Sequence, residues 1–381
     1  MYKRQDGNRI RNTEKASQNE ACTIDCIEKF VDPAVTDLLG VKSDVDKFNK
    51  LLSDPSFSDF AVTRVTNKKT REVKKSISQV CEQADEDDVI FFFYAGHGLK
   101  DQDRSYFLLC SDSEGDYLDA TCIEADFVLS QFRKSKCRNF IVIIDSCYSG
   151  AFFNNNRGIP NGLVALTACN ENEVAQETPE GGVFSNIIIN GLRSEYVDAD
   201  RDGKITFSEL FDYITAQFEL QAPKFGTPRK WEWNVHEDIC LVNSPRPVFV
   251  SYKRSQAKFV KRLSKTLNQQ EIATFVDQEK IRLGDDWKKL LGKTIKNSRA
   301  FLFVVSEDIM HSKVAMWELA FAHKHGVPIL PVVVEEFQIH AMFEEKYGHY
   351  NRLHFDQANF EKSAGVIVDH VKAIRMVSQT G

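Results

Sequence analysis

The sequence predicts an α/β protein with two domains, each built on a mostly parallel sheet. Residues 88–94 (DVIFFFY) and 139–144 (NFIVII) are continuous apolar runs, which is typical of strands buried on both faces. Amphipathic segments alternate with such runs, and the βαβα order predicts helices on both sides of a sheet. The chain has 381 residues, and at roughly 100–200 residues per domain it is long enough for two or three domains.

The first domain is expected over residues 21–240, after a flexible polar arm over 1–20. Residues 43–52 have helical spacing, because Val45, Phe48 and Leu52 fall on one face. The expected strands of this doubly wound sheet are 21–28, 60–66, 88–94, 139–144 and 163–168. The expected helices are 43–52, 69–84, 123–133, 183–196 and 207–219.

A linker is expected near 222–246, because residues 221–247 contain four prolines and no clear period. Its last part, 241–246, leads to a smaller second domain over 247–381. The expected strands there are 248–252, 272–276, 300–305 and 328–333. The expected helices are 256–268, 285–297, 312–325 and 358–376.

Composition excludes several classes of protein. The net charge of -6 is mild, which argues against a nucleic-acid binder. No apolar run approaches the ~18 residues of a membrane helix, and the first twenty residues lack the apolar core of a secretory signal. Nine cysteines without CxxC spacing indicate reduced thiols, so a cytoplasmic protein with no membrane contact is expected.

Two of the expected strands end in residues that carry chemistry. The run ending at Tyr94 continues into His97 and Gly98, and the run NFIVII continues into Asp145 and Cys147. In open α/β sheets, sites form at the carboxyl ends of strands, so neighbouring strands would bring the imidazole and the thiol together. A thiol needs such a base to become a nucleophile at neutral pH. The alternative is that Cys147 is an inert buried cysteine.

This arrangement resembles the prokaryotic branch of the caspase, metacaspase and paracaspase family over residues 21–240. The matching motifs are YAGHG, YFLLCSD, IIDSCYSG and TACNENEVAQE followed by GGVFSNII, and 50 residues separate the histidine from the cysteine as in caspases. The resemblance implies His97 as general base, Cys147 as nucleophile, and the N–H groups of Gly98 and Cys147 as oxyanion donors. No cofactor is implied for the peptidase.

Asp145 indicates the substrate preference, because a carboxylate two residues before the nucleophile can pair with arginine or lysine. Metacaspases carry an acidic residue here and cleave after basic residues, so we expect protein substrates cut after Arg or Lys. Tyr148 stands where histidine is usual in metacaspases.

A second motif is an acidic loop over 198–209 that fits a twelve-residue calcium loop. Carboxylates at Asp198, Asp200, Asp202 and Glu209 occupy positions 1, 3, 5 and 12, and Lys204 would offer its carbonyl at position 7. Prokaryotic caspase homologues carry a similar stretch as a turn between two helices, so calcium and a cation-free turn both stay open.

The second domain resembles a TIR domain over residues 247–335, which implies a flavodoxin-like parallel α/β fold. The motifs are PVFVSYKRSQ, Phe275-Val276-Asp277, the run from Ile281 to Trp287, Phe303 to Ser306, and Ser312 to Leu319. The resemblance implies Glu318 as the carboxylate of NAD cleavage, with Ser251, Tyr252 and Trp287 near the nucleotide.

TIR domains are NAD-cleaving enzymes, binders of signal nucleotides or adaptors. We expect a regulatory role, in which NAD or a cyclic ADP-ribose-type ligand, or TIR–TIR self-association, switches on the protease in bacterial antiphage immunity. The alternatives are an NAD glycohydrolase and a non-catalytic adaptor.

Overall fold

A computed structural model describes most of the chain. The described residues are 20–38, 40–55, 57–58, 60–154, 158–178, 181–194, 197–221, 226–235, 237–270, 272–276, 287–338 and 341–374. The arm expected over 1–20 lies outside them except for its last residue. The chain forms two compact units, one of residues 1–53, 59–182 and 226–236 and the other of residues 54–58, 183–225 and 237–381.

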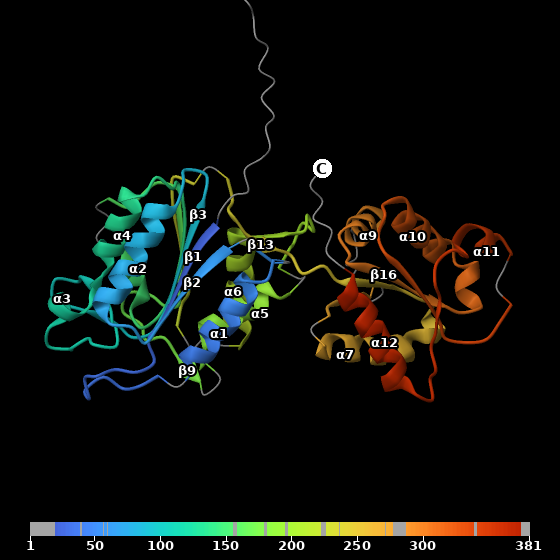
Figure 1. Ribbon diagram of the computed structural model, residues 1–381, viewed down its shortest axis with the longest axis horizontal. Helices are drawn as coiled ribbons and strands as arrows, with labels where there is room; N and C mark the ends of the chain where they lie inside the picture. The colour runs from blue at the N-terminus through green and yellow to red at the C-terminus, as the bar shows by residue number, and fades with distance from the viewer. Residues whose placement is uncertain are drawn as a thin grey trace, which may run out of the picture. The chain divides into compact units, whose positions relative to one another are not determined.

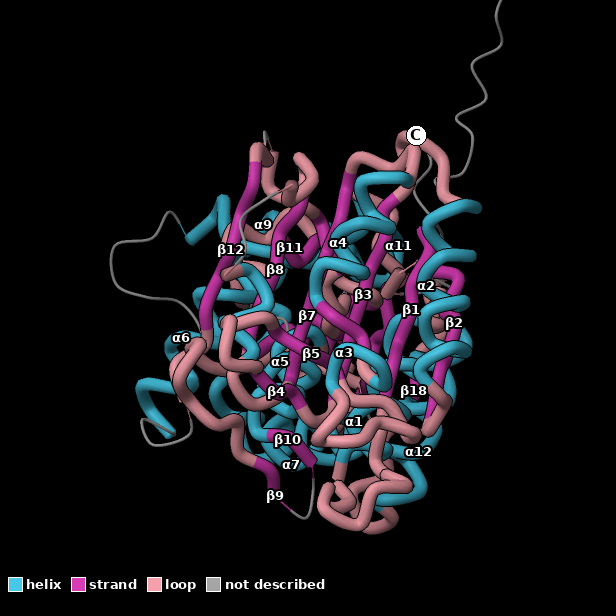
Figure 2. The backbone as a smooth tube through the Cα atoms, turned by 90° about the vertical axis from the view of Figure 1, so that its left-hand side faces the viewer, coloured by secondary structure: helices cyan, strands magenta, loops and turns pink. Residues whose placement is uncertain are grey.

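The first unit is built on a six-stranded sheet with the strand order β12-β8-β7-β3-β1-β2, which Figure 2 shows side by side. Five strands are parallel and the edge strand β12 is antiparallel to β8. The strands are β1 (Glu20–Cys26), β2 (Phe60–Thr66), β3 (Val89–Ala95), β7 (Asn139–Asp145), β8 (Leu163–Thr167) and β12 (Arg229–Trp233).

Helices cover both faces of this sheet, as its strand composition predicts. Successive side chains of a strand point to opposite faces. Phe92 of β3 contacts Phe132 of α4 (Ala125–Lys134), and Phe93 stacks on Phe48 of α1 (Val41–Leu52). Helix α2 (Thr70–Gln83) lies beside α4, on the face opposite α1 (Figure 1). The doubly wound sheet is therefore confirmed.

Several short strands, a short helix and a 3-10 turn lie at the carboxyl edge of the first sheet. A three-stranded sheet joins β4 (Gly98–Lys100), β5 (Tyr106–Leu108) and β6 (Ile123–Glu124), with α3 (Leu118–Thr121) inside its last connection. A 3-10 turn spans Ser149–Phe153, and β9 (Glu177–Thr178) pairs with β10 (Gly181–Gly182).

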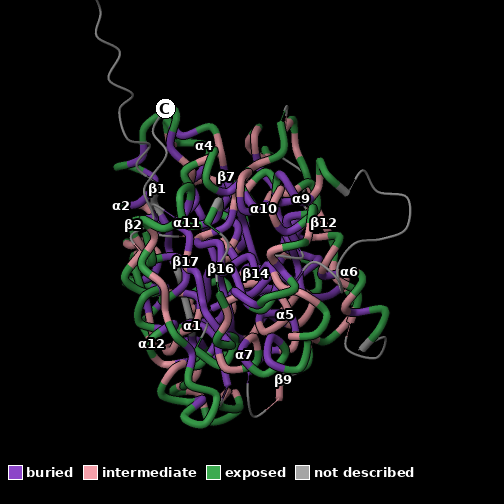
Figure 3. The backbone as a smooth tube through the Cα atoms, turned by 90° about the vertical axis from the view of Figure 1, so that its right-hand side faces the viewer, coloured by how far each residue is buried: buried purple, intermediate pink, exposed green. Residues whose placement is uncertain are grey.

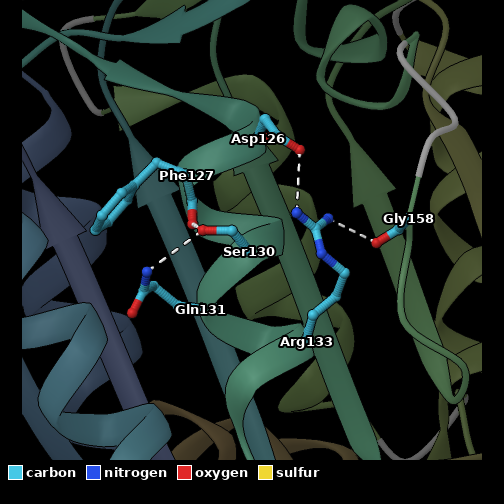
Figure 4. A network of polar contacts seen from close by, with 6 residues as sticks. All are labelled: Asp126, Phe127, Ser130, Gln131, Arg133 and Gly158. Atoms are coloured by element: carbon cyan, nitrogen blue, oxygen red, sulfur yellow. Dashed lines mark hydrogen bonds and ion pairs between the residues drawn. The ribbon is translucent and has the colours of Figure 1, made fainter.

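Polar contacts on α4 tie that helix to the segment that leads into β8 (Figure 4). The Arg133 guanidinium donates to the carbonyl of Gly158 at 2.7 Å and pairs with Asp126 at 3.4 Å. Ser130 donates to the carbonyl of Phe127 one turn back. Gly158 has φ +82, a conformation that favours glycine. The chain is thereby directed from the 3-10 turn back into the sheet.

The second unit contains a helical pair and a second sheet. Helices α5 (Val183–Leu192) and α6 (Phe207–Gln221) pack together, and β11 (Lys204–Thr206) pairs with β13 (Cys240–Asn243). The second sheet is all parallel with the order β15-β14-β16-β17-β18. Its strands are β14 (Val248–Ser251), β15 (Thr274–Val276), β16 (Ala300–Val305), β17 (Ile329–Val333) and β18 (Leu353–His354).

This order, 2-1-3-4-5, is that of flavodoxin-like folds. Alternate side chains of β14 again point to opposite faces of the sheet. Val248 and Val250 join a core with α7 (Ala257–Gln269) and α12 (Phe360–Ala373), whereas Phe249 joins one with α9 (Trp287–Lys296) and α10 (Lys313–Lys324). Figure 3 shows β14, β16 and β17 as buried. Helix α11 (Ala341–Tyr347) precedes β18.

The sequence prediction was wrong about the linker. The stretch 222–246 contains β12, which completes the first sheet, and β13, which covers part of 241–246. Its prolines flank these strands, where a missing N–H is tolerated. Among the described residues, no helix combines the length and apolar character needed to cross a bilayer.

Candidate active site

His97 and Cys147 lie at equivalent positions just beyond the ends of two neighbouring strands. In the parallel pair of β3 and β7, Ala95 is the partner of Asp145, and the N–H of Gly96 donates to the carbonyl of Asp145 at 3.2 Å. Each functional residue therefore follows its paired position by two residues. Because hydrogen-bonded strands run about 4.8 Å apart, the register brings the imidazole and the thiol to one edge of the sheet.

Gly98 allows the chain after His97 to approach the chain after Asp145. A Cβ at this position would come within 2.7 Å of the Cys147 carbonyl and closer still to the Tyr106 hydroxyl. That hydroxyl donates to the same carbonyl at 3.1 Å and bonds Ser146. The contact fixes the backbone of the nucleophile-bearing segment against β5, which pairs with the strand that begins at Gly98.

Thr36, which sequence reasoning missed, orients the imidazole. Its carbonyl lies 2.7 Å from Nε2 of His97. A carbonyl only accepts hydrogen bonds, so Nε2 carries the proton and Nδ1 of the neutral ring keeps its lone pair. The Phe30 ring packs against the imidazole at 5.1 Å between centroids. Both residues come from the loop after β1, which adjoins β3 at the point where the strand order reverses.

The Cys147 thiol is half-buried, and burial raises its pKa. The N–H of Ala175 lowers the pKa in part, and the charge of Asp145 raises it further. The thiol therefore rests protonated at neutral pH, and a neighbouring base must accept its proton during attack.

Lys100 connects three segments around the thiol. It lies three residues after His97, and its ammonium stands 5.0 Å from the centroid of the Tyr148 ring. It also donates to Asn172 Oδ1 at 3.0 Å and to the carbonyl of Glu171. Tyr148 has φ +57, which is strained for a bulky residue, and its N–H donates to the carbonyl of Glu173.

A second carboxylate meets Asp145 beside the thiol. The N–H of Gly182 donates to Asp44 Oδ2 at 2.6 Å, and a Cβ at Gly182 would come within 2.4 Å of Asp145 Oδ2. Both side chains are buried, at 1% and 8% exposure. Lys47 pairs with Asp44 at 3.5 Å from the next turn of the helix. The arrangement concentrates negative charge at one buried point.

Burial raises the pKa of Asp44 to about 7; the Gly182 N–H opposes this shift, and the charge of Asp145 adds to it. Sequence reasoning missed Asp44, although a signal was present. Asp44 falls on the apolar face of α1, between Val41 and Phe48. A carboxylate on such a face is a departure from the amphipathic pattern.

The acidic loop forms a turn between α5 and α6. Oxygens of Asp198, Asp200 and Asp202 lie within 4.8 Å of one another. Glu209 instead accepts from the N–H and hydroxyl of Thr206 and from the N–H of Ala199. Thr206 and Glu209 thus form a capping box at the start of α6. The three aspartates fit a cation, but the twelfth-position glutamate is engaged, and six to eight oxygens are needed for calcium.

In the C-terminal domain, a cleft of about 420 Å³ lies at the carboxyl ends of β14 and β16. Ser251 ends β14 and donates to Glu318 Oε2 at 2.6 Å. Glu318 is only 3% exposed, yet it lines the cleft together with Tyr252. The other lining residues are Lys253, Arg254, Ser255, Asp308, Ser312, Val314 and Ala315.

The structure therefore brings three of the four expected nucleotide-site residues together. Trp287 begins α9, but its side chain lies outside the described part of the chain, as do residues 277–286. The cleft sits at the strand-order reversal, where ligands bind in open α/β sheets. Lys253 and Arg254 offer cationic groups of the kind that bind phosphate.

Two family models match the chain. The caspase domain matches residues 19–271 and the TIR domain matches residues 248–365. The matches overlap at 248–271, and the structure places β14 and α7 of this overlap in the second sheet and its covering layer. No curated protein matches the chain.

Among solved structures, the crystal structure of caspase-1 from Spodoptera frugiperda matches with 17% identity and a TM-score of 0.45. The match covers 57% of this chain and 90% of that one. A protein of Geobacter sulfurreducens matches with 15% identity and a TM-score of 0.42, over 56% of this chain and 92% of that one.

Proposed function

Because this chain belongs to the caspase family, we propose that it is a cysteine endopeptidase that cleaves proteins after arginine or lysine. The observation that carries the proposal is the register of β3 and β7, which sets His97 and Cys147 at equivalent positions of one sheet edge. The buried carboxylates of Asp44 and Asp145 beside the thiol support the preference for a cation.

In the proposed mechanism, the Cys147 sulfur attacks the scissile carbonyl while its proton passes to Nδ1 of His97. The Thr36 carbonyl holds Nε2–H and so stabilises the imidazolium that forms. The N–H groups of Gly98 and Cys147 bind the oxyanion of the tetrahedral intermediate. His97 then returns the proton to the leaving amine as the C–N bond breaks. Water, deprotonated by His97, hydrolyses the thioester and restores the thiol.

Substrate choice follows from the charge in the pocket. A guanidinium that enters beside Asp44 and Asp145 forms charge-assisted hydrogen bonds with two desolvated carboxylates. An aspartate side chain there would add a third negative charge to the same site. Burial raises the pKa of Asp44, and the charge of Asp145 raises it further; a bound cation would oppose both effects.

Fluorogenic peptides that end in Arg, Lys or Asp test the proposal on the purified full chain. We expect cleavage of the basic peptides and loss of that cleavage in Cys147→Ala. Cys240→Ala is the matched control, because Cys240 is an exposed thiol far along the chain and should leave activity unchanged. Preference for Asp, or activity that survives in Cys147→Ala, would overturn the assignment.

The TIR domain is proposed as the regulator of this peptidase. Its cleft combines Lys253 and Arg254 with the buried pair of Ser251 and Glu318, which suits a nucleotide with phosphates and a ribose. We place the protein in the cytoplasm of a bacterium, in antiphage or cell-suicide immunity. Binding of NAD or a cyclic ADP-ribose-type ligand, or TIR–TIR self-association, would favour the active peptidase.

NAD cleavage is the second candidate function, because Glu318 lies in the cleft with its carboxylate held by Ser251. Such a carboxylate can stabilise an oxocarbenium-like ribose. Two variants separate the candidates when cellular toxicity and NAD are measured. Toxicity lost in Cys147→Ala and kept in Glu318→Ala supports the peptidase. The reverse result, with NAD depletion, supports the glycohydrolase, and toxicity kept in both supports an adaptor.

Addition of NAD or cyclic ADP-ribose isomers to the purified protein, with peptidase activity as the readout, tests regulation. We expect at least one of these nucleotides, or induced self-association, to raise activity. No response to any of them would end the regulatory proposal and leave the peptidase proposal standing.

A further inference from the structure

The acidic turn between α5 and α6 contacts the strand and helix that flank residues 277–286 of the TIR domain, all within the second compact unit. The Arg201 guanidinium stands 5.0 Å from the centroid of the Phe275 ring on β15. Its Nη1 donates to Thr294 Oγ1 on α9 at 2.5 Å. One side chain therefore contacts both elements, through its planar face and through its N–H donors.

Backbone carbonyls of the same turn accept from two further side chains of α9 or its end. Asn297 Nδ2 donates to the carbonyl of Arg201 at 2.6 Å, and Lys293 Nζ donates to the carbonyl of Asp200 at 2.7 Å. Lys293, Thr294 and Asn297 are spaced at i, i+1 and i+4, which places them on one side of the helix. The contact is thus a small polar surface of defined composition.

The turn is held in the conformation that presents Arg201. Asp198 accepts from the N–H groups of Asp202 and Gly203 at 3.0 Å each. Arg201 has φ +58, a left-handed conformation that an arginine keeps only when its surroundings fix it. The aspartates that match a calcium loop therefore also serve as acceptors that shape this turn.

The first helix of the pair begins next to a residue that contacts Asp44. Helix α5 begins at Val183, directly after Gly182, whose N–H binds Asp44. In sequence, α5 thus lies between Gly182, a backbone contact of Asp44, and the turn that carries Arg201.

We propose that the turn 198–203 is an intramolecular docking element, with Arg201 as its anchor, that holds β15 and α9 of the TIR domain on the α5–α6 pair. This element would also transmit a change in the TIR domain to Asp44 and Asp145. That second role rests on the proposed regulation. The docking itself does not depend on that regulation.

Hydrogen exchange in the full chain tests the docking, with the amides of α9 and β15 as the readout. Loss of an anchoring contact lowers the local opening free energy, so we expect exchange about fivefold faster or more in Arg201→Ala. Arg201→Lys keeps the charge but lacks the planar fork, and it should give an intermediate increase. Thr294→Val combined with Arg201→Ala should add little to Arg201→Ala alone. Arg138→Ala, an exposed arginine of the first unit, is the matched control.

Unchanged α9 exchange in Arg201→Ala, or fully additive effects of Arg201→Ala and Thr294→Val, would overturn the docking element. Peptidase assays with nucleotides separate this failure from failure of the proposed regulation. If nucleotides regulate the wild-type enzyme but Arg201→Ala leaves α9 exchange unchanged, the docking is refuted and the regulation stands. Faster α9 exchange in a protein that no nucleotide regulates supports the docking and refutes the regulation.

Discussion

The proposed contact of Asp44 and Asp145 with the substrate cation predicts that discrimination between arginine and its uncharged isostere citrulline depends on pH. The measurement is the ratio of kcat/KM for two peptides that differ only in this residue, from pH 6 to pH 8.5. The effect of pH on the catalytic step itself is common to both substrates, so it cancels in the ratio. What remains is the protonation state of the groups that contact the guanidinium.

The magnitude follows from Asp44, whose pKa burial raises to about 7. Above pH 7 this carboxylate is ionised, and the guanidinium binds two charges. Below pH 7 the cation must displace a proton, so the ratio should fall about tenfold for each pH unit. An uncharged citrulline side chain can bind while Asp44 is protonated, so its kcat/KM should not change as Asp44 loses its proton.

Asp44→Asn should make the ratio independent of pH between 6 and 8. A hydrogen bond to a charged group contributes about 1.5–3 kcal/mol, so the ratio above pH 7 should also fall about 10–100-fold. Asp46→Asn is the matched control, because Asp46 lies on the same helix but is exposed and paired with Arg64. A pH-independent ratio in the wild-type enzyme, or an unchanged ratio in Asp44→Asn, would refute the reasoning.

Stability gives an independent check with a definite sign. Between pH 4 and 7 the folded chain keeps the Asp44 proton, whereas the unfolded chain releases it. Folding stability therefore falls as pH rises through this window. Asp44→Asn removes that loss, so its free energy of unfolding relative to wild type should be greater at pH 8 than at pH 5, by at most about 3 kcal/mol. Denaturant titrations at the two pH values measure it, and a difference of opposite sign would contradict the burial argument.

Three further changes have definite outcomes. Gly98→Ala should abolish peptidase activity with little loss of secondary structure, because its Cβ would come within 2.7 Å of the Cys147 carbonyl; near-normal turnover would contradict this. Lys100→Met should lower kcat severalfold and leave the preference for arginine intact, which steady-state kinetics on arginine and lysine peptides will show. Calorimetry should detect no calcium binding at the acidic turn, because Glu209 caps α6. Glu209→Ala should lower the free energy of unfolding by about 1 kcal/mol. A heat of calcium binding in the wild-type chain that disappears in Asp198→Ala would contradict this interpretation.

The sequence predicts the two sheets well because their strands are buried on both faces. Runs such as FFFY and NFIVII have no amphipathic alternation, so they indicate parallel strands directly. The short strands were missed for the opposite reason. Segments of two to five residues, such as β10 and β12, take their conformation from a partner strand, and no local pattern encodes that partner.

Site candidates are signalled most directly where residues end or follow buried strands, whereas Glu318 of α10 was expected from the motif resemblance. His97, Cys147 and Asp145 end or follow buried strands, as do Ser251 and Tyr252. Thr36 contributes a backbone carbonyl, which any residue type could supply, so its identity carries no signal. Asp44 and Gly182 meet across 138 positions of sequence, and only the fold brings such distant residues together.

In the proposed function, charge at Asp44 and Asp145 decides the substrate preference more than packing does. At an effective dielectric of about 20, two unit charges 4 Å apart interact by about 4 kcal/mol. Burial has the larger effect on the pKa of Asp44, the charge of Asp145 raises this pKa further, and Lys47 opposes the rise. A guanidinium reverses the sign of the local interaction, whereas an aspartate side chain would add two more repulsive pairs. An uncharged side chain leaves the repulsion unchanged. In the proposed function, the two carboxylates therefore select the side chain that compensates their charge, and a bound cation would also reduce the effect of the Asp145 charge, which raises the pKa of Cys147.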